Sequence, residues 1–199
     1  MNPVVATLLK IVDCLTELSI EYAVMGGLAV RAHAIPRPTN DVDLTIALTR
    51  EKLPNWLEQL EERGVTVPNI YRTGWVDCVA GMPIVKLKTY MDPKQSVDID
   101  VFLAESEFQS GILARKVQVD VEGKPIWLIT AEDLILLKLI ASRPRDLIDV
   151  ADILFVQGEL DKDYMRKWSR PLGIEKPIST SPSIKQLVRL HKIRDLDPN

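Results

Sequence analysis

The stretch that decides the fold comprises Val24-Met25-Gly26-Gly27 and Asp41-Val42-Asp43-Leu44-Thr45-Ile46, with thirteen residues between them. Its first part reads as a short apolar strand over residues 21–25, followed by two glycines and by helical spacing up to His33. Glycine lets the backbone approach a ligand closely, and the first amides of a helix are free to donate to a phosphate. This junction therefore predicts a phosphate-binding turn.

The second part predicts a strand with two carboxylates on one face. Side chains alternate along a strand, so Asp41 and Asp43 share a face and lie about 7 Å apart along it, at a rise of about 3.3 Å per residue. Two unpaired carboxylates repel each other, whereas Mg²⁺ binds one or two of them and completes its shell with water and substrate phosphates. The pattern predicts metal-dependent chemistry on a nucleoside triphosphate, and a solvated strand face or a turn cap is the non-functional interpretation.

The combined motif resembles a known family. Gly26-Gly27, an intervening helix and loop, and Asp41-Val-Asp43-Leu resemble the signature of the DNA polymerase β-type nucleotidyltransferase superfamily. Three further motifs resemble its small prokaryotic branch, which includes the nucleotidyltransferase toxins of abortive-infection toxin–antitoxin systems. They are Arg37-Pro-Thr39-Asn-Asp41, Thr130-Ala-Glu132-Asp133-Leu-Ile-Leu-Leu-Lys138 and Arg145-Asp146-Leu-Ile-Asp149. The resemblance covers roughly residues 5 to 156.

The resemblance implies an enzyme that moves an NMP from an NTP to a hydroxyl acceptor with the help of two Mg²⁺ ions. It implies that Asp41 and Asp43 hold the metal ions and that a third aspartate, from a neighbouring strand, helps to activate the acceptor hydroxyl. The segment Ser96-Val-Asp98-Ile-Asp100-Val offers two such residues on one face. Asp100, which a hydrophobic run follows, is preferred, and Asp98 is the alternative.

Nucleotide-binding roles are implied for five residues, namely Gly26, Gly27, Arg37, Thr39 and Lys138. Lys138 interrupts the apolar run Leu134–Ile140, so its own surroundings favour a side chain that extends outward to solvent. The resemblance instead implies that its ammonium meets a phosphate as a point charge. Asp146 and Asp149 are expected either to orient Lys138 or Arg145, or to form structural ion pairs.

The fold class expected from these patterns is α+β, or α/β-like, with a short mixed sheet flanked by helices and a helical C-terminal part. We expect a catalytic core over residues 1–129, a helical part over 130–170 that closes the cleft, and a Pro-rich linker and tail over 171–199. Thr130 is expected to cap the helix that follows it. A strand is expected over residues 113–121.

Composition places the chain among soluble globular proteins. Of its 199 residues, 46% are hydrophobic and 27% are charged, which is ordinary for a packed domain. No apolar run approaches the roughly 18 residues that a membrane span requires, and the N-terminus does not resemble a secretory signal. We therefore expect a cytoplasmic protein without membrane contact.

The net charge of −3 argues against broad, nonspecific attraction to nucleic acid. A local basic groove stays compatible with it, and its candidate residues are Lys86 and Lys88, Arg115-Lys116, and Lys185 to Arg194. The toxin resemblance favours the 3′ end of tRNA as acceptor and implies a cognate antitoxin as partner. The alternatives are a protein or small-molecule acceptor such as an aminoglycoside, or a non-catalytic module that binds a nucleotide or a partner. The complete carboxylate set favours an enzyme.

Overall fold

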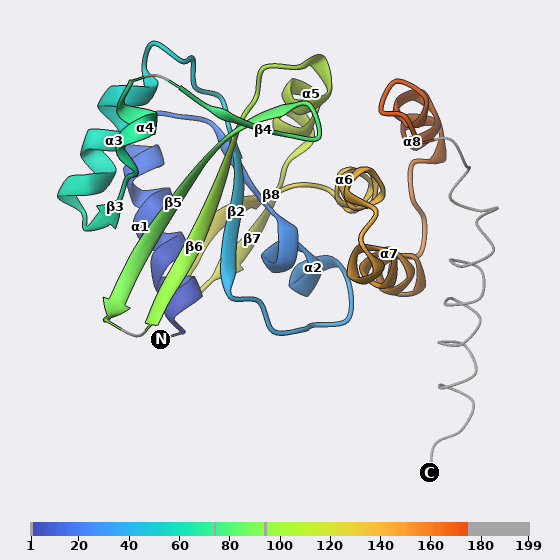
Figure 1. The fold of residues 1–199 in the computed structure, drawn as a ribbon. Helices are drawn as coiled ribbons and strands as arrows, with labels where there is room; N and C mark the ends of the chain where they lie inside the picture. The colour runs from blue at the N-terminus through green and yellow to red at the C-terminus, as the bar shows by residue number, and fades with distance from the viewer. Residues whose placement is uncertain (1, 74, 94, 175–199) are drawn as a thin grey trace. The chain divides into compact units, whose positions relative to one another are not determined.

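The computed structural model describes residues 2–73, 75–93 and 95–174, so most of the predicted linker and tail lies outside the described residues (Figure 1). Within these ranges the helices are α1 (Pro3–Glu17), α2 (Gly26–His33), α3 (Leu53–Glu62), α4 (Asn69–Arg72), α5 (Glu107–Arg115), α6 (Ala131–Ala141), α7 (Pro144–Val156) and α8 (Lys162–Ser169). The strands are β1 (Tyr22–Met25), β2 (Asp41–Ile46), β3 (Val65–Thr66), β4 (Asp77–Val79), β5 (Met82–Asp92), β6 (Gln95–Leu103), β7 (Val117–Val121) and β8 (Lys124–Leu128).

The strands of the described chain form one mixed sheet in the order β3-β5-β6-β2-β1-β8-β7, with β4 paired to β5. Strand β2 runs parallel to β6 and antiparallel to β1, and β5 runs antiparallel to β6. Figure 1 shows helices beside this sheet. The prediction of an α+β fold with a mixed sheet flanked by helices is confirmed.

The hydrophobic core lies against one face of the central strands. Val42, Leu44 and Ile46 of β2 are fully buried, and so is Ile99 of β6. Helix α1 packs against β2 and β6 and contributes fully buried residues such as Ile11 and Leu15 to this core. Because side chains alternate along a strand, the polar residues of β2 and β6 project from the opposite face.

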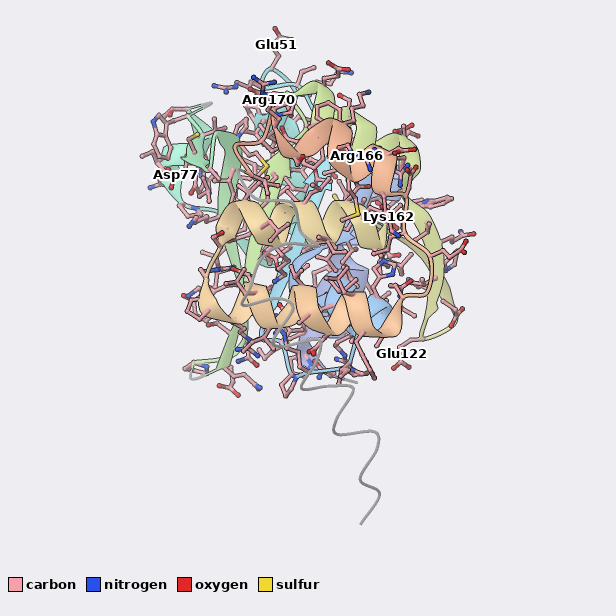
Figure 2. The ribbon with its side chains drawn as sticks, turned by 90° about the vertical axis from the view of Figure 1, so that its right-hand side faces the viewer. Glu51, Asp77, Glu122, Lys162, Arg166 and Arg170 are labelled. Carbon is pink, nitrogen blue, oxygen red and sulfur yellow. The ribbon has the colours of Figure 1, made fainter. Side chains whose placement is uncertain are left out.

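The chain divides into two compact units. The first unit comprises Met1–Leu28 and Pro38–Ile129, and the second comprises Ala29–Arg37 and the chain from Thr130 onward. The first unit therefore contains the whole sheet. In the second unit α6 and α7 lie side by side, and α8 carries the labelled Lys162 and Arg166 (Figure 2).

Residues 107–115 differ from the sequence prediction. The strand expected over residues 113–121 begins only at Val117, and Glu107–Arg115 forms helix α5. The Ser106 hydroxyl caps this helix by accepting a hydrogen bond from the backbone N–H of Gln109 at 3.2 Å. Ser-x-x-Gln is a capping-box pattern, so this helix start was visible in the sequence and the strand prediction extended too far upstream.

The predicted cap of α6 is confirmed. The Thr130 hydroxyl accepts a hydrogen bond from the backbone N–H of Asp133 at 3.3 Å. Asp133 is fully buried, and its carboxylate accepts a hydrogen bond of 2.5 Å from the Tyr164 hydroxyl of α8. This contact ties α8 to α6 within the second unit. No helix among the described residues is both long enough and apolar enough to cross a membrane.

Candidate active site

Four aspartates lie on one face of two neighbouring strands in the first unit. Asp41 of β2 is in register with Asp98 of the parallel strand β6, and Asp43 is in register with Asp100. Paired residues of parallel strands point to the same face, and neighbouring strands are about 4.8 Å apart. The register therefore places the two aspartate pairs of the sequence on neighbouring strands, and we call these four residues the aspartate quartet.

The backbone of Gly26 lies directly against the quartet. Met25 pairs with Asp43 across β1 and β2, so the glycine turn follows beside this carboxylate. Gly26 adopts a φ of +61°, and a Cβ atom built on it would stand 1.8 Å from Oδ2 of Asp43. Only glycine fits this approach, which links the Gly-Gly turn to the carboxylate strand physically.

We expect Gly26→Ala to displace the Asp43 carboxylate and to weaken binding of Mg²⁺-NTP. A non-glycine residue with this φ also costs about 1–3 kcal/mol of stability. Gly64→Ala is the matched control, because Gly64 has a φ of +79° but a Cβ there meets nothing within 4 Å. Thermal melts measure the shared backbone strain, and calorimetric titration measures nucleotide binding. Equal nucleotide affinity in the two variants would show that the contact with Asp43 has no functional consequence.

The members of the quartet have different neighbours. Thr39 donates a hydrogen bond of 2.5 Å from its hydroxyl to Oδ1 of Asp41, which orients that carboxylate. Lys88 of β5 pairs with Asp98, with 2.9 Å between Nζ and Oδ1. The hydrogen bond and charge of Asp98 raise the pKa of the Lys88 ammonium. Asp98 is thus engaged by a cation, while Asp100 lies beside Asp43.

The donors of the quartet suit Mg²⁺, because they are all carboxylate oxygens. Among residues 2–73, 75–93 and 95–174, no three or more His, Cys, Asp or Glu side chains are gathered as a ready-made metal-binding group. Mg²⁺ does not require such a group, since it usually takes one or two protein carboxylates and fills its remaining positions with water and substrate phosphates. Asp41 and Asp43 offer the one or two carboxylates that this requires.

A second charged cluster lies in the second unit, around a buried lysine. Nζ of Lys138 is 2.9 Å from Oδ1 of Asp146 and 2.8 Å from Oδ2 of Asp149, and its side chain is only 9% exposed. Arg37 donates to both oxygens of Asp149, at 2.7 and 2.8 Å. Arg143 donates from Nε to Oδ2 of Asp146 at 2.6 Å. We call these five residues the lysine cluster.

The lysine cluster changes the interpretation of Lys138. Its side chain does not extend outward to solvent, because two carboxylates satisfy its ammonium inside the second unit. Asp146 and Asp149 both form ion pairs with the lysine, which fits both sequence alternatives, orientation of Lys138 and structural ion pairing. Arg143 was missed by sequence reasoning. It lies three residues before Asp146 at the start of α7, and its backbone N–H donates a hydrogen bond of 3.3 Å to Oδ2 of Asp146.

Electrostatics favour the ionised form of both aspartates in the lysine cluster. Burial raises the pKa of Asp146, but the hydrogen bonds from Arg143 and Lys138 outweigh it, so the pKa is lowered. Burial likewise raises the pKa of Asp149, and the hydrogen bonds from Arg37 and Lys138 lower it below the ordinary value. Both carboxylates are thus charged at neutral pH.

The lysine cluster makes stability depend on pH. With depressed pKa values in the folded state, the two aspartates stabilise the protein fully above about pH 3.9, the unfolded value, and this contribution is lost as the pH falls through the folded pKa. We expect Asp149→Asn to melt well below the parent at pH 7 and the difference to narrow below pH 3.9. Asp163→Asn, at an exposed position of α8, should melt like the parent throughout. A difference in melting temperature between Asp149→Asn and the parent that does not change with pH would contradict this account.

The chain is similar to several solved structures. An antigenic nucleotidyltransferase-like protein from Paracoccidioides brasiliensis is 21% identical, and the match covers 97% of this chain and 90% of that chain with a TM-score of 0.50. ANT(2'')-Ia in complex with adenylyl-2''-tobramycin is 16% identical, with 96% and 98% of the two chains covered and a TM-score of 0.47. The lincosamide antibiotic adenylyltransferase LnuA, bound to lincomycin, is 13% identical, with 75% and 96% covered and a TM-score of 0.48.

The similarity with a TM-score of 0.50 concerns the fold alone. A sequence comparison with curated proteins finds no match. One family model matches residues 6–172, which include the glycine turn, the quartet and the lysine cluster. The chain therefore belongs to the DUF6036 family, which is described as nucleotidyltransferases of unknown function.

Proposed function

We propose that the protein is an Mg²⁺-dependent nucleotidyltransferase that transfers an NMP from ATP or another NTP to the hydroxyl at an RNA 3′ end, with tRNA as the favoured acceptor. The toxin resemblance supports the RNA acceptor, and one observation carries the nucleotidyl-transfer part of this proposal. It is the register that sets Asp41 and Asp43 beside Asp98 and Asp100, with the Gly26 backbone against Asp43. Carboxylates next to a close backbone approach are what a metal-bound triphosphate requires.

The reaction forms a bond between the acceptor oxygen and the α-phosphorus and breaks the bond from the α-phosphorus to the bridging oxygen, so that pyrophosphate leaves with the electron pair. Asp41 and Asp43 would hold the metal, and Thr39 keeps Asp41 oriented. When bound, Mg²⁺ supplies charge neutralisation and lowers the pKa of the attacking hydroxyl. Asp100 is assigned to the acceptor side, where it receives the hydroxyl proton or shares a metal ion. Arg37 and Lys138 stay sequence predictions for the nucleotide phosphates.

We expect Asp100→Asn to slow transfer far more than Asp98→Asn, by about a hundredfold. The reason is that Asp98 is paired with Lys88, whereas Asp100 is in register with the metal ligand Asp43. Single-turnover rates with saturating NTP measure the two effects separately from product release. Equal losses would mean that the two residues act together, and the reverse order would assign the third carboxylate to Asp98.

The acceptor is tested by incubating the protein with each α-labelled NTP, Mg²⁺, total RNA, a protein extract and an aminoglycoside. The proposal expects label in RNA and none when EDTA removes the metal. Label in protein or in the aminoglycoside would replace RNA as the acceptor. Binding of Mg²⁺-NTP without transfer to any acceptor would show a nucleotide-binding module.

The toxin resemblance supports a further part of the proposal, which is growth inhibition relieved by a cognate antitoxin. Induced expression of the wild type should arrest growth, while Asp43→Asn should not. Growth at the normal rate with active, soluble wild-type protein would remove the toxin role and would leave the chemistry intact.

A further inference from the structure

The face of β5 that neighbours the quartet carries two lysines and a tyrosine in alternate positions. Lys86, Lys88 and Tyr90 lie two residues apart, while Leu87 and Thr89 between them are buried. Alternate residues of a strand share a face, so the three side chains project together, away from the core. We call them the β5 strip.

The sheet register places the β5 strip beside the quartet. Lys86 is opposite Asp100, and Lys88 is opposite Asp98. Directly opposed residues of antiparallel strands have Cβ atoms about 4.5–5.5 Å apart. The strip therefore begins next to the carboxylate assigned to the acceptor and runs along β5 away from it.

The three side chains of the strip differ in their ion pairing and their exposure. Lys88 is paired with Asp98, whereas Lys86 is exposed and has no ion-pair partner among the residues that the structure describes. Tyr90 is 56% exposed, so its ring is accessible for stacking. The strip thus presents a cation beside Asp100 and an aromatic face further along the strand.

We propose that the β5 strip binds the acceptor as a single-stranded polynucleotide, with the lysines neutralising its phosphates and the Tyr90 ring stacking on a base. Surfaces that bind single strands combine a cationic track with aromatic side chains of this kind. This inference rests on the proposed function, because it names the surface that binds the RNA acceptor of that reaction.

The geometry also gives the direction of the bound strand. Its terminal hydroxyl lies at Asp100, beside Lys86, and the preceding nucleotides follow β5 toward Tyr90. Four residues of an antiparallel strand span about 13–14 Å, so Tyr90 contacts a nucleotide upstream of the terminal one. A dinucleotide acceptor is too short to reach Tyr90, whereas a 12-nucleotide acceptor contacts it and should therefore bind more tightly.

The binding test needs neither NTP nor catalysis. Fluorescence anisotropy of a labelled 12-nucleotide RNA, with a DNA of the same sequence in a second arm, is measured at several salt concentrations. Lys86→Gln and Lys88→Gln should each reduce the slope of log affinity against log salt by about 0.7. Tyr90→Ala should weaken binding about fivefold or more, and Tyr90→Phe should restore it because the ring is kept. Equal binding of the DNA means that phosphates and bases suffice, and weaker binding of the DNA adds the ribose hydroxyl to what is recognised.

The matched control is Lys124→Gln. Lys124 is an exposed lysine of β8, ion-paired to Asp13 as Lys88 is to Asp98, and β8 is separated from β5 by β6, β2 and β1. This variant should bind RNA like the wild type. The inference is overturned if the strip variants bind RNA like this control, or if the wild type binds neither RNA nor DNA.

Transfer measured on the same proteins separates this inference from the function on which it rests. In the Tyr90→Ala variant, the KM for the 12-nucleotide acceptor should rise while the KM for a dinucleotide stays unchanged. Transfer only to a protein or a small molecule would overturn the inference and leave nucleotidyl transfer standing. RNA binding that depends on the strip, without any NMP transfer, would overturn the proposed function and leave the RNA-binding surface standing.

Discussion

Asp43→Asn is expected to slow nucleotide transfer by about a hundredfold or more, because metal coordination supplies several kcal/mol of transition-state stabilisation and each 1.36 kcal/mol is tenfold in rate. The substitution removes the charge of a proposed metal ligand and nearly preserves its volume. It also relieves repulsion within the quartet, where Asp43 is in register with Asp100, so the apo protein should melt at or above the parent temperature. Single-turnover assays and thermal melts measure the two effects.

Asp77→Asn is the matched control for Asp43→Asn, because Asp77 belongs to β4 of the same sheet and lies outside the quartet. Its transfer rate and melting temperature should match those of the parent. Near-normal turnover in Asp43→Asn would remove the two-metal assignment. A lower melting temperature in Asp43→Asn, with the control unchanged, would identify a structural carboxylate instead.

Lys138→Met is expected to destabilise the second unit by about 3 kcal/mol, because it removes the cation shared by two buried carboxylates. This loss of stability is at the low end of the range for breaking a buried ion pair, since Arg37 still contacts Asp149 and Arg143 still contacts Asp146. Denaturant unfolding measures the loss. Stability within about half a kcal/mol of the parent would mean that the two arginines alone satisfy the aspartates.

A double variant tests the cause of this loss. Adding Asp149→Asn to Lys138→Met removes one of the two charges that the lysine balanced, so the combined loss should be clearly smaller than the sum of the single losses. Lys162→Met, on an exposed position of α8, should leave stability unchanged. Titration of Mg²⁺-ATP into the folded Lys138→Met variant tests the nucleotide-binding role that the resemblance implies. If Lys138 has this role, the variant should bind Mg²⁺-ATP about tenfold more weakly than the parent.

The composition of the quartet could be predicted from the sequence, but its assembly could not. Alternation along a strand shows that Asp41 and Asp43 share a face, and the same holds for Asp98 and Asp100. That β2 and β6 are parallel neighbours with these residues in register depends on pairing between segments far apart in the chain. No local spacing contains this information, and only the family resemblance anticipated a neighbouring strand.

The lysine cluster shows the same limit of local patterns. The apolar residues around Lys138 predicted its helix, but its surroundings in sequence favoured a solvent-exposed ammonium. The structure instead joins Asp149 to Arg37 across 112 residues, and a contact of that separation is decided by tertiary packing. In contrast, the missed start of α5 was a local signal, because Ser106 and Gln109 form a capping pattern within four residues.

The central claim is transfer of an NMP, and the most direct measurement compares NTPs labelled at the α- or the γ-phosphate in the presence of Mg²⁺ and RNA. The account predicts that the α-label enters RNA and that the γ-label appears only in released pyrophosphate. The Asp43→Asn variant should neither label RNA nor release pyrophosphate. Appearance of the γ-label in the acceptor would show phosphoryl transfer instead. Failure of every NTP to label any acceptor or to release pyrophosphate, with folded wild-type protein, would contradict the account.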